Sequence, residues 1–217
     1  ATANGRFTNN SMTGNYWTYM FGGAWWPTED FGLSGNYAQS VRNPSVTELF
    51  SPRSTDYETG VDPCSDAGIG SGPNPAIRAA NCAKAGITQP FTSNFNFYTI
   101  PGSAGGNSNL KNETSKSYTG SLEFRPHFVR GLDMKASFVD VKVKNAITYL
   151  GAQDLMNACY DSSSYPSNAF CNTFTRDSSG QLSTFSAGYY NIASHETQAL
   201  QATFDRSDGR RVGIEVT

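Results

Sequence analysis

The feature that most constrains the fold of this sequence is the order of its connections. Six segments alternate apolar and polar residues in the way that predicts strands, and they form three pairs joined by short turns. Long irregular stretches, at about residues 42–116 and 144–187, separate the pairs. The expected hairpins cover about residues 15–41, 117–143 and 188–217, with the short connections PTED, PHFVRG and DRSDGR.

This order of short and long connections favours an all-β, antiparallel barrel that crosses a membrane. Outer-membrane barrels keep the turns on one side of the bilayer short, while the extracellular loops grow long. Most of the segments reach the ~9 to 11 residues that a membrane-crossing strand needs, whereas strands of globular proteins are usually about 5 or 6 residues long. A connection as long as residues 42–116 is also unusual inside a compact soluble domain. We therefore expect a transmembrane barrel segment with two long extracellular loops.

Defects in the alternation leave a second fold class open. After Phe138 the apolar positions shift by one residue, to Val139, which predicts a bulge or a change of environment along that strand. Glu196 and Gln198 interrupt the apolar positions of the fifth strand. Periodicity alone also fits a secreted β-sandwich that binds a ligand, and this class stays as the alternative.

Composition excludes several other classes. The 217 residues include 16 Lys+Arg and 18 Asp+Glu, and the net charge of −2 argues against nucleic acid as a partner. No run approaches the 18 or more apolar residues of a membrane-spanning helix, so a helical membrane protein is excluded and a strand-built one is not.

Two motifs flank the first long stretch. The segment RNPSVTELF resembles the R-x-P-x-x-x-E-L-F segment of TonB-dependent outer-membrane receptors, and GNSNLKNETS resembles the G-N-x-x-L-x-x-E-x-S segment of the same family. Further similarities follow in the same order, around Asp62-Pro63-Cys64 and then Cys159-Tyr160 and Arg176-Asp177. The matching motif residues, which we expect to organise the base of the loop, are Arg42, Pro44, Glu48, Leu49, Phe50, Gly106, Asn107, Leu110 and Glu113.

The resemblance implies a partial receptor. Family members carry a plug domain and a barrel of about 22 strands, whereas residues 1–217 supply about six expected strands and no plug. A glycine that many relatives have near the start of the fifth strand is replaced by Thr197-Gln198-Ala199, which leaves the register of that strand open. As the resemblance implies, the whole receptor would take up a scarce ligand, such as a siderophore–iron chelate or an oligosaccharide. Its partners would be outer-membrane lipid, the plug domain, the TonB-ExbB-ExbD system acting through that plug, and a small-molecule ligand.

The cysteines fit an exported protein. All four lie in the two long stretches, and an even number of loop cysteines indicates an oxidising compartment. Of the three pairings, we favour Cys64–Cys82 and Cys159–Cys171, because each closes a loop locally. No C-x-x-C pair is present, so no metal site is expected.

Four aromatic residues in the first long stretch are candidates for ligand contact. Phe91, Phe95, Phe97 and Tyr98 lie between Pro90 and Pro101, where they could present a stacking surface or pack the loop onto itself. No nucleophile elbow, paired-carboxylate motif or phosphate-binding glycine loop is present, so we expect no catalytic residue, no enzymatic activity and no cofactor.

Overall fold

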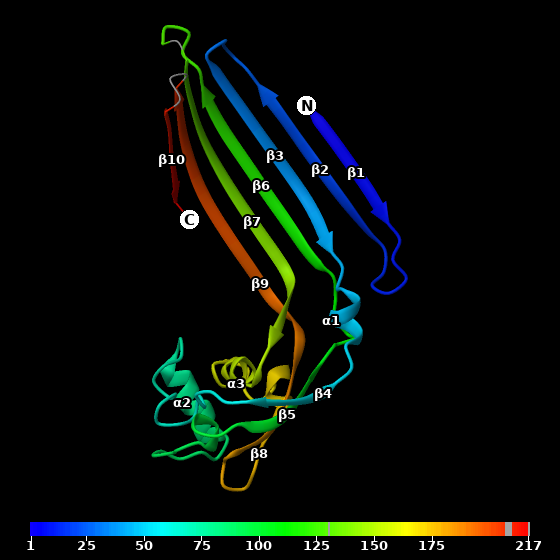
Figure 1. Cartoon of the computed structure of the whole chain (residues 1–217), viewed down its shortest axis with the longest axis vertical. Coiled ribbons are helices and arrows are strands. Elements are labelled where there is room, and N and C mark those ends of the chain that lie inside the picture. Colours follow the sequence, from blue (N-terminus) through cyan, green and yellow to red (C-terminus); the bar gives the residue numbers. More distant parts are fainter. Residues whose placement is uncertain (130, 207–209, 217) are drawn as a thin grey trace. The chain divides into compact units, whose positions relative to one another are not determined.

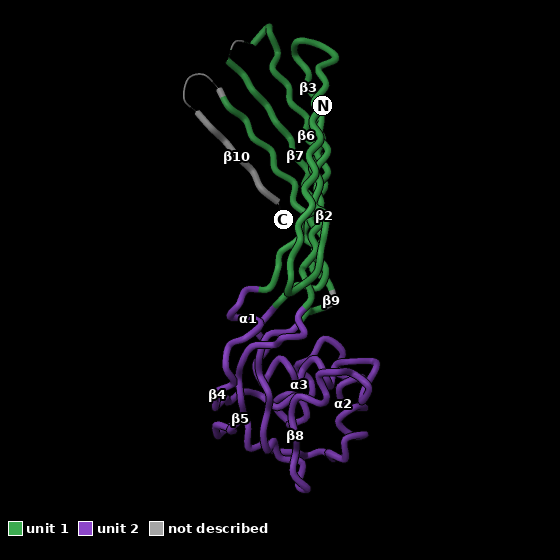
Figure 2. The backbone as a smooth tube through the Cα atoms, turned by 90° about the vertical axis from the view of Figure 1, so that its right-hand side faces the viewer, with its two compact units in different colours: residues 1–44, 111–147, 191–217 green, residues 45–110, 148–190 purple. Residues whose placement is uncertain are grey.

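The protein is described here by a computed structural model that covers residues 1–129, 131–206 and 210–216. The chain divides into two compact units, which Figure 2 distinguishes by colour. Unit 1 comprises Ala1–Pro44, Lys111–Ile147 and Asn191–Thr217, and unit 2 comprises Ser45–Leu110 and Thr148–Tyr190.

Unit 1 is a single sheet of long strands (Figure 1). Neighbours follow the order β1-β2-β3-β6-β7-β9-β10, and the pairs β1–β2, β2–β3, β3–β6, β6–β7 and β9–β10 are antiparallel. The strands of this unit pair in one continuous sheet, which differs from the two packed sheets that the β-sandwich alternative requires. The strands are β1 (Thr2–Thr8), β2 (Tyr16–Trp25), β3 (Phe31–Arg42), β6 (Glu113–Phe124), β7 (Leu132–Leu150), β9 (Leu182–Arg206) and β10 (Arg210–Val216), of which β7 and β9 also supply residues to unit 2.

The observed strands differ from the expected ones in number and length. β1 was not expected, because TANGRFT is short and mostly polar, and its pairing with β2 is a tertiary contact. β7 continues to Leu150 and β9 begins at Leu182, so both are longer than the sequence pattern indicated. Thr197-Gln198-Ala199 lies inside the continuous strand β9. Parts of two expected turns, at residues 130 and 207–209, and the last expected strand residue, 217, lie outside the described residues.

The expected bulge in β7 is absent. Pairing of β6 with β7 runs without a register shift from Thr114↔Lys144 to Phe124↔Met134. Successive side chains of a regular strand point to opposite faces, so Phe138 and Val139 lie on opposite sides of the sheet. The other interpretation of the shifted apolar positions, a change of environment along the strand, stays a prediction.

The two faces of the unit 1 sheet differ in composition. We call the face that carries Leu33, Tyr37 and Tyr118 the aromatic face. Its side chains include large apolar groups about half exposed, and an uncovered apolar surface of this extent is typical of a surface buried by lipid or a partner. On the opposite face, β3 and β6 place small and polar residues, namely Ser34, Asn36, Ala38, Ser40, Ser115, Ser117, Thr119 and Ser121.

Unit 2 contains the two stretches expected to be irregular, and this expectation was wrong because they form regular elements around a core. β4 (Ser54–Glu58) and β5 (Ile100–Gly105) form an antiparallel pair, and β5 pairs in parallel with β9 at Ser103–Gly105. The helical segments are α1 (Val46–Phe50), α2 (Pro75–Lys84), η1 (Asn94–Asn96), α3 (Ala152–Tyr160) and η2 (Ala169–Asn172), followed by β8 (Phe174–Arg176).

Local sequence explains the main helix of unit 2, and burial explains its core. α2 begins with Asn74, whose side chain accepts a hydrogen bond from the Ile77 amide, and with Pro75 in its first turn, both common helix starts. Fully buried core side chains come from separate parts of the sequence and include Phe95, Met156 and Leu182. No helix in the described part of the chain is long and apolar enough to span a membrane.

Candidate functional site

Two disulfides lie inside unit 2. One joins Cys64 to Cys82 on α2, and the other joins Cys159 on α3 to Cys171 on η2. Cys64, Cys82 and Cys159 are at most 1% exposed. These are the two local pairs that the sequence favoured, and they cross-link segments that also pack in the core.

A buried ion pair holds the centre of unit 2. Asp62 is completely buried, and its carboxylate accepts hydrogen bonds from Arg176 at 2.6 and 2.7 Å. The same carboxylate accepts bonds from the Ser93 hydroxyl at 2.7 Å and the Cys64 amide at 2.9 Å. Burial by itself raises the pKa of Asp62, but the bonds and charge of Arg176, with those from Ser93 and Cys64, outweigh it, so the pKa lies below its ordinary value.

A second ion pair connects the two longer helices. Arg78 on α2 has a side chain only 4% exposed, and it donates to both carboxylate oxygens of Asp161 at 2.6 Å. Its guanidinium also donates to the Gly68 carbonyl and to Asn157. Sequence reasoning missed both buried pairs, because their partners lie far apart in the chain; the one signal available was the presence of Asp62 and Arg176 in the family-like segments.

The two family-like motifs meet within unit 2. Ser45 and Glu48 form a capping box at the start of α1, the Glu48 carbonyl accepts a hydrogen bond from the Asn107 amide at 2.8 Å, and Asn107 donates to the Tyr189 carbonyl. A Cβ on Gly106 would lie 2.7 Å from the Ser51 nitrogen, so only glycine fits this close approach. Leu49 and Leu110 are buried, whereas Phe50 is 54% exposed.

The remaining motif residues lie in unit 1. Arg42 and Glu113 are register partners on β3 and β6, and the guanidinium contacts the carboxylate at 2.5 and 3.0 Å. Glu113 also accepts a hydrogen bond from the Ile147 amide on β7. Pro44 is buried. This pair therefore links three neighbouring strands at one end of the sheet.

The four candidate aromatic residues of unit 2 fall into two groups. Phe95 is completely buried in the core, and Phe91 is partly buried against it, so the packing interpretation describes these two. Phe97 and Tyr98 are 69% and 70% exposed. Only Phe97 and Tyr98 therefore present a large aromatic surface on which a ligand could stack.

A small polar hollow of about 270 Å³ also lies in unit 2. Its lining includes Arg53, Asn107 and backbone around Gly105 and Gly188. The Arg53 guanidinium donates to the hydroxyls of Ser186 at 2.7 Å and Ser103 at 2.9 Å, which fixes a cation at the wall of the hollow. No cluster of three metal-binding side chains is found in the parts of the chain that the structure describes.

Comparison with known proteins relates the sequence to one family. The family model described as "TonB dependent receptor-like, beta-barrel" matches residues 1–198. No curated protein matches the sequence significantly.

Solved structures share the fold. The siderophore receptor PirA from Acinetobacter baumannii is similar at 14% identity and a TM-score of 0.54, over 95% of this chain and 23% of that chain. A mutant of the ferric enterobactin receptor PfeA from Pseudomonas aeruginosa, in complex with enterobactin, is similar at 13% identity and a TM-score of 0.57, over 99% of this chain and 24% of that chain. The chain thus spans about a quarter of the length of these receptors. Because the family model covers most of its sequence, the chain belongs to the TonB-dependent receptor-like β-barrel family.

Proposed function

We propose that this chain is part of an outer-membrane active transporter that takes up a scarce small-molecule ligand with energy supplied through TonB. The single observation that carries the proposal is the match of residues 1–198 to the receptor barrel family. The aromatic face of unit 1 supports it, since an uncovered apolar sheet face suits contact with lipid. The proposal assigns the chain no enzymatic step.

Within this proposal, unit 1 lies in the membrane and unit 2 contributes to ligand capture outside the cell. A siderophore–iron chelate is the first ligand class to test, because PirA and PfeA are described as siderophore and ferric enterobactin receptors. An oligosaccharide is the second class. Phe97 and Tyr98 supply an exposed stacking surface for either class. A plug domain elsewhere in the whole receptor, and the TonB-ExbB-ExbD system acting through it, complete the transporter.

The first experiment uses the full-length receptor in its own bacterium. We expect it to sediment with outer membranes, and we expect uptake of a labelled ferric siderophore or oligosaccharide to stop when either the receptor gene or tonB is deleted. Recovery of the receptor only in the soluble fraction, or uptake that is unchanged by both deletions, would contradict the proposal.

The second experiment tests the aromatic surface. Phe97→Ala and Tyr98→Ala in the full-length receptor should each weaken binding of the transported ligand by roughly tenfold, as expected when a contact aromatic is truncated. Phe128→Ala is the matched control, because Phe128 is 72% exposed but lies in a short turn of unit 1. Equal affinities for all three variants and the wild type would remove Phe97 and Tyr98 from the ligand site.

A further inference from the structure

A row of glycines crosses the aromatic face of unit 1. Gly23 on β2 pairs with Gly35 on β3, and Gly35 pairs with Gly120 on β6, so the three lie side by side on neighbouring strands. Phe138 on β7 is the next register partner and closes the row. Because neighbouring strands lie about 4.8 Å apart, the three glycines leave roughly 10 Å of sheet without side chains.

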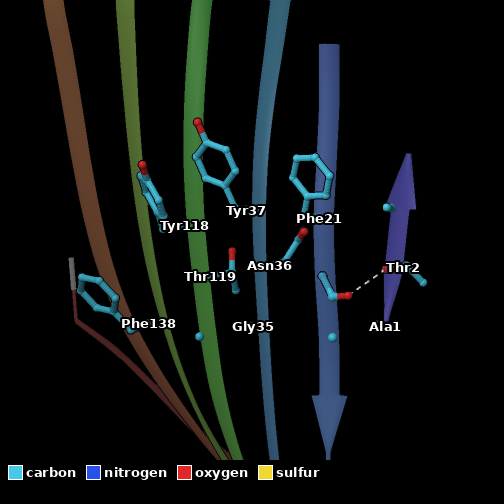
Figure 3. Close-up of a pocket in the computed structure, with 13 residues that line it drawn as sticks. Ala1, Thr2, Phe21, Gly35, Asn36, Tyr37, Tyr118, Thr119 and Phe138 are labelled. Atoms are coloured by element: carbon cyan, nitrogen blue, oxygen red, sulfur yellow. Dashed lines mark hydrogen bonds between the residues drawn. The ribbon is translucent and has the colours of Figure 1, made fainter. Parts of the chain in front are cut away.

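Large side chains border this row on both sides. Phe21, Tyr37 and Tyr118 form one wall, and Trp25, Leu33 and Leu122 form the other by the same register. Figure 3 shows the rings of Phe21, Tyr37, Tyr118 and Phe138 on successive strands around the bare backbone. An open hollow of about 750 Å³ lies over the glycines and is lined by Phe21, Tyr37, Tyr118 and Phe138, with Ala1 and Ala3 at its β1 end; we call it the glycine groove.

Packing within the chain does not require these glycines. A Cβ on Gly120 would meet nothing within 4 Å, and Cβ atoms on Gly35 and Gly23 would meet their nearest atoms only at 3.8 and 3.9 Å. None of the three has a positive φ. Glycine inside a strand costs stability relative to alanine and often marks the close approach of another molecule. The groove therefore suits an occupant from outside the chain.

The groove ends at a band of charge. One row beyond the tyrosines on the same face, Lys116 on β6 stands directly opposite Lys142 on β7, and Lys144 follows two residues further along. Like charges in direct opposition destabilise a sheet. Lys142 is bonded to Glu196 at 2.8 Å, but no ion pair to Lys116 or Lys144 is found within the described residues. Among the described residues of this face, Asp140 and Glu196 oppose the three lysines, so the band carries one excess positive charge.

We propose that the glycine groove and the lysine band form a binding site for one phosphorylated membrane lipid. An acyl chain lies over Gly35 and Gly120, and the head-group phosphate contacts Lys116, with Lys144 within reach. Charge complementarity selects a phosphate-bearing lipid, because an acyl chain alone gives Lys116 no counter-charge. This inference rests on the proposed membrane location of unit 1.

The test uses the full-length receptor purified from outer membranes and transferred into nanodiscs of phosphatidylcholine with phosphatidic acid. Native mass spectrometry then counts the lipids retained. Lys116→Gln should reduce retained phosphatidic acid by roughly tenfold, the loss expected for one charge-assisted bond, and leave phosphatidylcholine unchanged. Lys135→Gln is the matched control, because Lys135 lies on the opposite face of β7 and is also exposed.

The groove is tested by filling it. Gly120→Val should reduce retention of both lipids, whereas Ser117→Val, on the opposite face of the same strand, should not. Gly120→Ala, whose methyl group meets nothing within 4 Å, replaces the valine variant if that variant is not recovered from outer membranes. Unchanged retention in Lys116→Gln and in the recovered Gly120 variant would overturn the lipid site.

Two further outcomes are separated by the same samples. Displacement of phosphatidic acid by inorganic phosphate alone would show a phosphate site without a lipid site, and would also overturn the inference. A receptor that fractionates with outer membranes but shows no lipid selectivity contradicts this inference alone. A receptor that stays soluble contradicts the proposed function instead.

Discussion

Replacement of Asp62 by asparagine tests how unit 2 is held together. The Asp62 carboxylate receives four hydrogen bonds, two of them from Arg176, and the two side chains are 0% and 10% exposed. In Asp62→Asn one of the two accepting oxygens becomes an NH₂ group, which cannot accept the hydrogen bonds that the carboxylate received. The Arg176 charge is then buried without a counter-ion. Breaking a buried pair in this way costs about 3 to 5 kcal/mol. This loss corresponds to a roughly hundred- to several-thousandfold larger opening equilibrium.

Hydrogen exchange measured by mass spectrometry on the full-length receptor gives the free energy of local opening directly. The amides of α3 should lose protection in Asp62→Asn, while those of β6 should not change. Asp177→Asn is the matched control, because Asp177 is exposed and its oxygen accepts turn bonds that asparagine can also accept. The double variant Asp62→Leu/Arg176→Met should lose less protection than Asp62→Asn, since it leaves no unpaired charge.

The same pair predicts a pH dependence. The pKa of Asp62 is lower in the folded unit than in the unfolded chain, so the carboxylate contributes stability above its ordinary pKa and loses it as the pH falls through the lowered value. Protection of the wild-type α3 amides should therefore decrease in acid more than protection in Asp62→Asn does. Equal protection of wild type and Asp62→Asn at neutral pH would refute the assignment of a stabilising pair.

Three further perturbations have defined outcomes. Replacing both Cys159 and Cys171 by serine should destabilise unit 2 by about 3 kcal/mol, the value for a closed loop of this size. Tryptic cleavage in residues 148–190 should then be faster, and unchanged cleavage would argue against a stabilising cross-link. Burial is the largest influence that raises the pKa of Glu58, and the nearby Asp56 and Asp154 add to it. Glu58→Gln should therefore leave exchange protection in β4 equal or higher at neutral pH, and the difference should shrink in acid. A clear loss of protection at neutral pH would contradict this. Glu113→Ala should lower the free energy of local opening at the strand end by about 1 to 3 kcal/mol, seen as faster exchange at the Ile147 amide. The control Glu123→Ala should leave that amide unchanged, and equal exchange in both variants would show that the Arg42–Glu113 pair does not secure the strand end.

Much of unit 1 could be predicted from the sequence because strand alternation is a local property. Tyr37 and Val41, or Tyr118 and Leu122, share a face whatever the strand pairs with. The shifted apolar positions after Phe138 were also visible, but the sequence could not distinguish a bulge from a change of environment. The unbroken register of β6 with β7 excludes the bulge after Phe138 and places Asp140 and Lys142 on the same face as Phe138.

The candidate site was predictable only where its contacts are local. The pairs Cys64–Cys82 and Cys159–Cys171 join residues separated by 18 and 12 positions, so a preference for short loops was enough to favour them. Asp62 and Arg176 are separated by 114 positions, and no local pattern connects them. Burial of Phe95 and exposure of Phe97 likewise depend on which segments pack around η1, not on the residue types.

The sequence by itself determined which residues alternate, which motifs resemble a receptor barrel and which cysteines could join locally. Only the tertiary structure decided that residues of the long connections share a core and that Gly23, Gly35 and Gly120 stand in one row. The physical reason is that periodicity is set by the geometry of one strand, whereas register and burial are set by partners distant in the chain.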